Sequence, residues 1–331
     1  MKIGIIFGGN SKEHEISIIT AYAVKRKLIN FYDVKMIYID FNQNVYDASK
    51  LSLNDFKNKK YKKLKKTMLV QHGIKSTSLD CAVLAVHGEN CEDGIISALC
   101  RFYNIPFVGC DILASSISLD KFATYQYLKN DLPLIETKRY TRHDFIIGNV
   151  VDYFPCILKP TYGGSSIGIN ICSSKDEFFI KAKESLKECD EIIIQPFYKD
   201  IIEYNMAFYE NGNSKLEKID KKSEYFSFDD KYNESFKMIH QKLVLDDEEK
   251  FITLGRRVYE LLRCKGIIRI DFFKIKDEIY INEINTIPGS LGMYLFDNFS
   301  NILMEEIELE MKRKNNVYCM NGYLQIKSFN K

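Results

Sequence analysis

The chain has 331 residues, of which 46% are hydrophobic and 28% are charged, and its formal net charge is +2. This length can bury two or three hydrophobic cores, and so small a net charge gives no general basis for binding nucleic acid or a membrane surface. No apolar run approaches the ~20 residues of a membrane-spanning helix, and the run after Met1 is too short for a signal peptide. The nine cysteines include no C-x-x-C pair, so we expect free thiols and a cytoplasmic protein.

Residues 1–110 alternate between apolar strands and helices. Strands are expected at 2–7, 34–40, 79–87 and 105–109, and helices at 16–28 and 94–104. This alternation predicts a parallel sheet in an α/β domain that ends near residue 110. Asn10 or Ser11 is expected to cap the first helix. Gly8-Gly9 does not extend to a G-x-G-x-x-G motif, so no dinucleotide site is predicted there.

Two α+β domains are expected after residue 110, one at 111–200 and one at 201–331. The first combines a helix that carries Lys121 and a helix at 174–188 with strands at 154–160, 169–172 and 191–197. The second combines helices at 248–264 and 299–313 with strands at 201–212 and 214–220 and a hairpin within 266–289. We find no internal repeat and no low-complexity linker.

The hairpin within 266–289 carries a strong chemical signal. Apolar and polar residues alternate in IIRIDFFK and in EIYINEIN, as expected for two half-buried strands joined by a tight turn near Lys276. The side-chain period of two places Arg269 and Asp271 on one face, and Glu283 and Asn285 on one face. Carboxylate and amide oxygens of this kind suit Mg²⁺. A solvated surface hairpin is the alternative, which the dense apolar flank and the Pro288-Gly289 turn disfavour.

The segment from Lys159 to Gly168, KPTYGGSSIG, follows an apolar strand. Glycines let backbone N–H groups approach phosphate oxygens, and serine hydroxyls and a lysine ammonium add donors. The order of residues differs from a Walker A loop. On these residues alone, a phosphate-binding loop and an ordinary glycine-serine turn remain equally open.

Together, R-x-D-F-F, I-N-E-I-N-T-x-P-G and K-P-x-x-x-G-S-S-x-G resemble the D-alanine–D-alanine ligase family of the ATP-grasp superfamily. The resemblance extends from Gly8 to Gly289. It implies an ATP-grasp fold preceded by a parallel-sheet α/β domain. It also implies an enzyme that joins two D-alanines through an acyl phosphate for peptidoglycan synthesis. ATP and D-amino acids would be the substrates, two Mg²⁺ ions (or Mn²⁺) would be bound, and a homodimer is the commonest assembly to expect.

The resemblance also implies roles for individual residues. Asp271, Glu283 and Asn285 would hold the metal ions, while Arg269 and the Gly289 N–H would stabilise the tetrahedral oxyanion. Glu15 would receive the ammonium of the first D-alanine, with Ser165, Tyr232 and His87 nearby. ATP would be bound by Lys121, Lys159, Gly164, Ser166, Gln195, Tyr198, Glu203 and Lys231. Alone, a glutamate at a helix start is usually a solvated charge, and a histidine at a strand end is usually structural.

Three stretches depart from the family pattern. Cys91 replaces the inner glycine of the H-G-x-x-G-E-D-G motif, and residues 194–198 lack the usual glutamate and lysine of the adenine segment. Gly289 is followed by SLGMYL, where Ser290 is the candidate to contact the second substrate. D-Serine as the second substrate, a different carboxylate–amine ligase and a non-catalytic nucleotide-binding protein therefore remain open.

Overall fold

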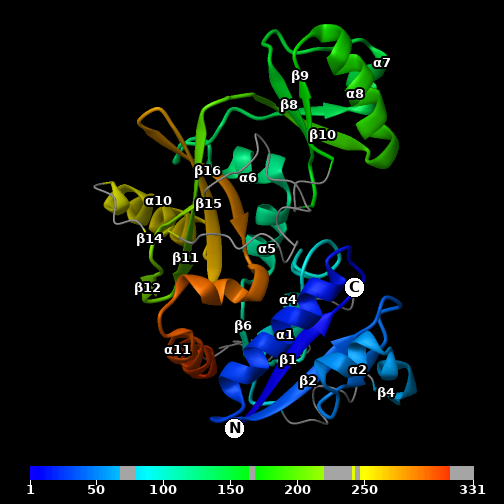
Figure 1. The fold of residues 1–331 in the computed structure, drawn as a ribbon, viewed down its shortest axis with the longest axis vertical. Coiled ribbons are helices and arrows are strands. Elements are labelled where there is room, and N and C mark those ends of the chain that lie inside the picture. The colour runs from blue at the N-terminus through cyan, green and yellow to red at the C-terminus, as the bar shows by residue number, and fades with distance from the viewer. Residues whose placement is uncertain (68–78, 164–167, 220–240, 243–246, 314–331) are drawn as a thin grey trace, which may run out of the picture.

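The computed structural model describes residues 1–67, 79–163, 168–219, 241–242 and 247–313. Over these ranges the strands form three sheets, which follow one another along the long axis of the molecule (Figure 1). The N-terminal sheet lies at one end, the sheet of β7–β10 lies at the other, and the sheet that contains the hairpin lies between them. Within the described ranges, none of the helices has the length and apolar character to cross a membrane.

The N-terminal sheet has the order β4-β3-β2-β1-β5-β6. The four neighbouring strands β2, β1, β5 and β6 run parallel. The strands are β1 Lys2–Gly8, β2 Asp33–Ile39, β3 Val45–Asp47, β4 Lys66–Thr67, β5 Cys81–Leu84 and β6 Phe107–Val108. The helices are α1 His14–Leu28, α2 Leu53–Lys57, η1 Lys60–Lys63 and α4 Ile95–Phe102. The predicted parallel sheet is present, and the short antiparallel strands β3 and β4 on one side of it were not predicted.

The expected cap of α1 was wrong. Glu13 is the N-cap residue, and no side chain caps the helix. Ser11 instead accepts a hydrogen bond from Glu13 N and donates one to the His87 carbonyl oxygen at 2.5 Å. The serine therefore ties the start of α1 to the loop after β5.

The second sheet is antiparallel, with the order β7-β10-β8-β9. Its elements are β7 Lys138–Thr141, α7 Arg142–Ile146, β8 Cys156–Pro160, β9 Asn170–Cys172, α8 Lys175–Glu188 and β10 Glu191–Pro196. Helix α8 packs Phe178, Ala182 and Leu186 on the sheet, at the four-residue spacing of one helix face. The helices α5 Ile112–Leu119 and α6 Lys121–Leu128 connect this sheet to the N-terminal one.

The third sheet is antiparallel, with the order β14-β13-β11-β15-β16 and with β12 paired to β11. Its elements are β11 Ile201–Tyr209, β12 Gly212–Asn213, β13 Glu217–Ile219, β14 Gln241–Lys242, α10 Glu248–Leu261, β15 Ile268–Ile275 and β16 Glu278–Asn285. Helix α10 covers one face, and Gly255 allows close contact, because an added Cβ would lie 1.9 Å from the Phe208 ring. The other face is left for the cleft described below.

The chain returns to the N-terminal sheet after β16. The 3-10 segment η3 Gly289–Leu295 and helix α11 Phe299–Lys312 follow the hairpin. Leu291, Leu303 and Ile307 are buried in the same core as β1 and β5. The turn after the hairpin therefore packs on the N-terminal core, although it directly follows the last strand of the third sheet in the sequence.

Candidate active site

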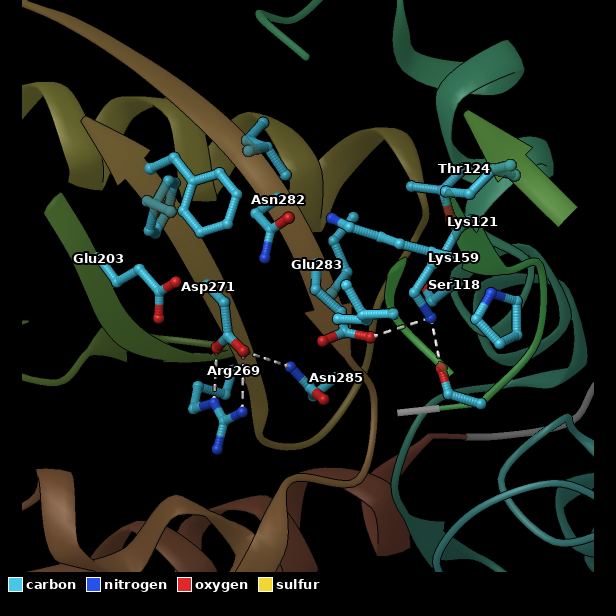
Figure 2. A pocket seen from close by; sticks show the side chains of 18 of the residues that line it. Ser118, Lys121, Thr124, Lys159, Glu203, Arg269, Asp271, Asn282, Glu283 and Asn285 are labelled. Atoms are coloured by element: carbon cyan, nitrogen blue, oxygen red, sulfur yellow. Dashed lines mark hydrogen bonds and ion pairs between the residues drawn. The ribbon is translucent and has the colours of Figure 1, made fainter. Parts of the chain in front are cut away.

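A cleft of about 1390 Å³ opens between the three sheets. Its lining includes residues of α1, the loop after β5, α6, β8, β10, β11, β15, β16 and η3. The side chains of one part of this lining are drawn in Figure 2, where the lysines of α6 and β8 point toward the acidic face of the hairpin.

The β15–β16 hairpin contributes the acidic face. Its two-residue turn lies between Ile275 and Glu278, as the sequence predicted. Asp271 pairs with Glu283 and Arg269 pairs with Asn285, so these four side chains form a cross-strand group on the cleft. The pairing shifts after Asp271, because Phe272 pairs with Ile281, and Asn282 is left as the extra residue of a β-bulge.

Asp271 is held by several donors. Arg269 donates from Nε to Oδ1 at 2.7 Å and from Nη2 to Oδ2 at 2.9 Å, and Asn285 Nδ2 donates to Oδ2 at 3.3 Å. The Asn205 amide nitrogen, on the neighbouring β11, donates to Oδ1 at 3.0 Å. Burial lowers the pKa of Arg269, but the Asp271 carboxylate outweighs burial, and the net shift is upward. The carboxylate of Asp271 is therefore fixed in place and kept beside a positive charge.

Two lysines face the hairpin from the other side of the cleft. Lys121 is the first residue of α6, and Asp120 caps the N-terminus of this helix. The Nζ of Lys121 lies 3.3 Å from Glu283 Oε1. The same ammonium donates to the Gly163 carbonyl oxygen, at the described edge of the glycine-serine loop. Lys159 Nζ, at the end of β8, lies 6.0 Å from the centre of the Phe273 ring. Two ammonium groups and a helix N-terminus form a region that suits phosphate groups.

The donor set fits a magnesium site. Asp271 and Glu283 offer carboxylate oxygens and Asn285 offers an amide oxygen. These are the hard donors that Mg²⁺ takes together with phosphate oxygens. Their negative charge is balanced by Arg269 and Lys121. Asp271, Glu283 and Asn285 are the three residues for which the sequence proposed metal binding.

A partly apolar wall of the cleft lies between the second and third sheets. Its lining includes Ile157, Ile193, Phe197 and Phe273. Gln195, Tyr198 and Glu203 line the same wall, and Gln195 Nε2 donates to Thr137 Oγ1 at 2.8 Å. Figure 2 shows Glu203 beside Asp271, on the strand next to β15. A flat aromatic base and its sugar would find apolar surface with polar groups at the rim here.

The N-terminal side of the cleft holds a second acidic group, which the sequence did not fully predict. Within the described residues, Glu13, His87 and Glu92 each place one ligand atom within 4.8 Å of the others. Burial lowers the pKa of His87 to about 4, so its imidazole is neutral at pH 7. Burial raises the pKa of Glu92 to about 8. A bound cation would stabilise the ionised form of this carboxyl group.

The placement of Glu15 in this group was wrong. Glu15 is exposed on α1 and does not line the cleft, whereas Glu13 does. Glu13 is the non-helical N-cap residue and Glu15 belongs to the first turn of α1, so helix periodicity does not relate their side chains. Glu13 precedes the first helical residue, and no sequence pattern fixed which of the two glutamates faces inward.

The remaining predicted residues divide into two sets. Gly289 and Ser290 line the cleft, and a Cβ added to Gly289 would meet no atom within 4 Å. Tyr294, which the sequence did not single out, also lines the cleft, and Arg269 Nη1 donates to its hydroxyl at 3.3 Å. Gly164, Ser165, Ser166, Lys231 and Tyr232 lie outside the described residues.

Cys91, which departs from the expected motif, is buried where Gly9 leaves room for it. A Cβ added to Gly9 would lie 2.2 Å from Cys91 Sγ. Burial raises the pKa of the Cys91 thiol to about 12, which makes it a poor nucleophile. The eight cysteines in the described residues are all free thiols.

The sequence matches two family models over most of its length. Residues 2–110 match the model described as D-ala D-ala ligase N-terminus, and residues 131–302 match the model described as D-ala D-ala ligase C-terminus. The chain is 38% identical to a D-alanine–D-alanine ligase of Campylobacter lari, with 95% of each chain covered. It is 34% identical to a D-alanine–D-alanine ligase of Helicobacter pylori, with 98% of each chain covered.

Solved structures agree with these matches. The crystal structure of D-alanine–D-alanine ligase from Helicobacter pylori superimposes with a TM-score of 0.78 at 30% identity, and 95% of this chain and 99% of that chain are covered. The VanG D-Ala:D-Ser ligase of Enterococcus faecalis has a TM-score of 0.77 at 24% identity over 93% of this chain and 99% of that chain, which shows a shared fold. The predicted ATP-grasp fold is thereby confirmed, and the chain belongs to the D-alanine–D-alanine ligase family.

Proposed function

We propose that this protein is an ATP-dependent ligase that joins two D-alanines to give D-alanyl-D-alanine, ADP and phosphate, for use in peptidoglycan precursors. One observation carries the proposal: Lys121 and Lys159 lie across one cleft from the group formed by Arg269, Asp271, Glu283 and Asn285. The relatives that are 34–38% identical over most of the chain are D-alanine–D-alanine ligases, which favours an enzyme over a non-catalytic nucleotide-binding protein.

ATP would occupy the apolar wall, with its phosphates directed at the lysines. Gln195, Tyr198 and Glu203 would contact the base and ribose, because they line the wall between the second and third sheets. Lys121 and Lys159 would bind phosphate oxygens, and Lys121 would exchange its contacts with Glu283 and Gly163 for them. Gly164, Ser166 and Lys231 are proposed from the sequence to complete this phosphate site.

Mg²⁺ would be held by Asp271, Glu283 and Asn285, and two ions are proposed, with Mn²⁺ as a substitute. When bound, the metal would neutralise the charge of the transferred phosphate. The chain's own part is to hold the ligand oxygens ready: Arg269, Asn205 and Asn285 fix Asp271, as described above.

The first D-alanine would bind beside Glu13 and Glu92. Its ammonium would lie between these carboxylates, next to the neutral imidazole of His87, and Ser165 and Tyr232 are proposed to join them. Its carboxylate would then point at the γ-phosphate of ATP. The carboxylate attacks the γ-phosphorus, the bond to the bridging oxygen breaks, ADP leaves and an acyl phosphate forms. Phosphoryl transfer depends mainly on positioning and on stabilising charge, and this cleft supplies both.

The second D-alanine would attack the acyl phosphate from the η3 side of the cleft. Its neutral amine adds to the acyl carbon. The tetrahedral adduct then collapses, the bond to phosphate breaks, and phosphate leaves with the proton of the amine, which leaves the peptide bond. Arg269 and the Gly289 N–H would stabilise the oxyanion, since both line this part of the cleft. Ser290 is proposed to contact the second substrate, and D-serine is the alternative acceptor because a hydroxyl could pair with Ser290.

The remaining proposals concern location and assembly. We place the protein in the cytoplasm, with domain boundaries near residues 110 and 200, and expect no nucleic-acid or membrane partner. A homodimer is supported by four exposed apolar side chains, Ile95 and Phe102 on α4 and Ile112 and Leu113 at the start of α5. Sedimentation of wild type and Phe102→Ser tests it: a monomeric wild type would refute the dimer.

A phosphate-release assay tests the function. Phosphate release from ATP should require both Mg²⁺ and D-alanine, and L-alanine should not replace D-alanine. A chain that binds ATP but releases no phosphate with D-alanine would be a binder and not a ligase.

A further inference from the structure

The turn after the hairpin has an unusual backbone. Ser290, Leu291 and Gly292 have φ values of 52°, 52° and 64°, so three consecutive residues adopt the left-handed conformation. L-residues other than glycine rarely adopt it, because Cβ crowds the following carbonyl oxygen. A turn of this kind persists only where surrounding contacts hold it.

Contacts from the N-terminal sheet and its helix hold this turn. Ser290 N donates to Thr20 Oγ1 at 3.0 Å, across 270 positions of sequence. Leu291 is buried in the N-terminal core, and Leu291 N donates to the Pro288 carbonyl oxygen at 2.7 Å. Thr20 is itself completely buried on α1.

Thr20 has a second partner that fixes its orientation. Thr20 Oγ1 lies 2.8 Å from His87 Nε2. The hydroxyl accepts from Ser290 N, so its own proton can be donated to Nε2 when the imidazole carries its proton on Nδ1. His87 also forms a hydrogen bond with the backbone of Ile287. The segment around the turn is therefore contacted both by Thr20 of helix α1 and by His87 of the loop after β5.

We propose that Thr20 is a positioning residue for the ligation step: its hydroxyl, held between His87 and the Ser290 N–H, fixes the left-handed turn and so places Gly289 at the reacting carbonyl. The proposal rests on the oxyanion role of Gly289 proposed above. It also explains why Gly289, and not Ser290, would supply the backbone donor, because the Ser290 N–H is directed at Thr20. Thr20 borders the cleft but is completely buried, so its action on the substrate is through the turn.

Two variants of Thr20 separate the hydroxyl from the volume of the side chain. Thr20→Val keeps the shape and removes the hydroxyl, whereas Thr20→Ser keeps the hydroxyl and removes a methyl group. Ser97→Ala is a matched control, because Ser97 is also buried and its Oγ donates to the Cys110 carbonyl oxygen at 2.8 Å, away from the cleft. Should Thr20→Val not fold, Thr20→Cys, with a weak thiol donor, takes its place.

Three readouts are needed: kcat, the KM for ATP, and hydrogen exchange of peptides that cover 286–295. Thr20→Val should lower kcat by about 10- to 100-fold, as a small misplacement of a reacting group does. Its KM for ATP should stay unchanged, and the 286–295 amides should exchange faster. Thr20→Ser and Ser97→Ala should keep the wild-type kcat and the wild-type exchange.

Three results would overturn the proposal: wild-type kcat in Thr20→Val, an equal loss in Thr20→Ser, or an equal loss in Ser97→Ala. Faster exchange in Thr20→Val with normal kcat would show that the turn is held but that its position does not matter to the reaction. Failure of the proposed function is a separate result, namely no dipeptide from the wild type. In that case, if the 286–295 amides of Thr20→Val exchanged at the wild-type rate, this would still refute the claim that Thr20 holds the turn.

Discussion

Asp271 on β15 and Glu283 on β16 are direct register partners, and Glu283 shares the cleft face with Asp271 because Asn282 is inserted as a bulge before it. Ile279 and Ile281 point into the core at a spacing of two, and Ile284 follows at a spacing of three. Without the extra residue, the period of two would place Glu283 on the face of Ile281. The candidate metal site therefore depends on one inserted residue as well as on the acidic side chains.

Removing either carboxylate charge should stop turnover without unfolding the protein. Asp271→Asn and Glu283→Gln each delete one ligand charge beside the phosphates, so kcat should fall by about 100-fold or more at saturating Mg²⁺. Paramagnetic resonance of bound Mn²⁺ gives an independent measure and should show weaker binding in both. Glu278→Gln, at the exposed start of the same strand, is the control. Near-normal kcat in both variants would remove the hairpin from the active site.

The glutamates at the start of α1 should differ sharply. Glu13→Gln removes a carboxylate that lines the cleft, so the KM for the first D-alanine should rise at least about tenfold, as expected for a lost charge-assisted hydrogen bond. Glu15→Gln changes an exposed side chain two residues away and should leave the kinetics near wild type. Steady-state assays with D-alanine as the varied substrate decide this, and the reverse pattern would restore Glu15 to the site.

Binding of the first D-alanine should release a proton near neutral pH. Burial raises the pKa of Glu92 to about 8, so its carboxyl group is protonated at pH 7 in the free protein. A substrate ammonium favours the ionised form, so affinity should rise as pH increases toward 8 and then level off. Calorimetry in buffers of different ionisation enthalpy measures the proton released. A pH-independent affinity, or the same dependence in Glu92→Gln, would contradict this role.

Much of the site was predictable because its residues are close in sequence. The placement of Arg269 with Asp271, and of Glu283 with Asn285, follows from strand periodicity, and the isoleucine spacing even contained the signal of the bulge. Buried strands and amphipathic helices such as α8 were predicted for the same reason.

Features that depend on packing between distant segments were not predictable. The choice of Glu13 over Glu15 is set by how α1 sits on the sheet, and the Thr20–Ser290 bond joins residues 270 positions apart. Asn205 reaches Asp271 only because β11 pairs with β15 in one particular register. The short strands β3 and β4 carry too little pattern to be recognised.

The most direct test is a competition for the second substrate. The protein would be incubated at neutral pH with ATP, Mg²⁺ and equal concentrations of D-alanine, D-serine and D-lactate, and the products would be identified by mass spectrometry. We expect D-alanyl-D-alanine as the main product, formed together with equal amounts of ADP and phosphate. D-Alanyl-D-serine as the main product would overturn the acceptor assignment. D-Alanyl-D-lactate as the main product, or ADP without any dipeptide, would contradict the proposed ligase function itself.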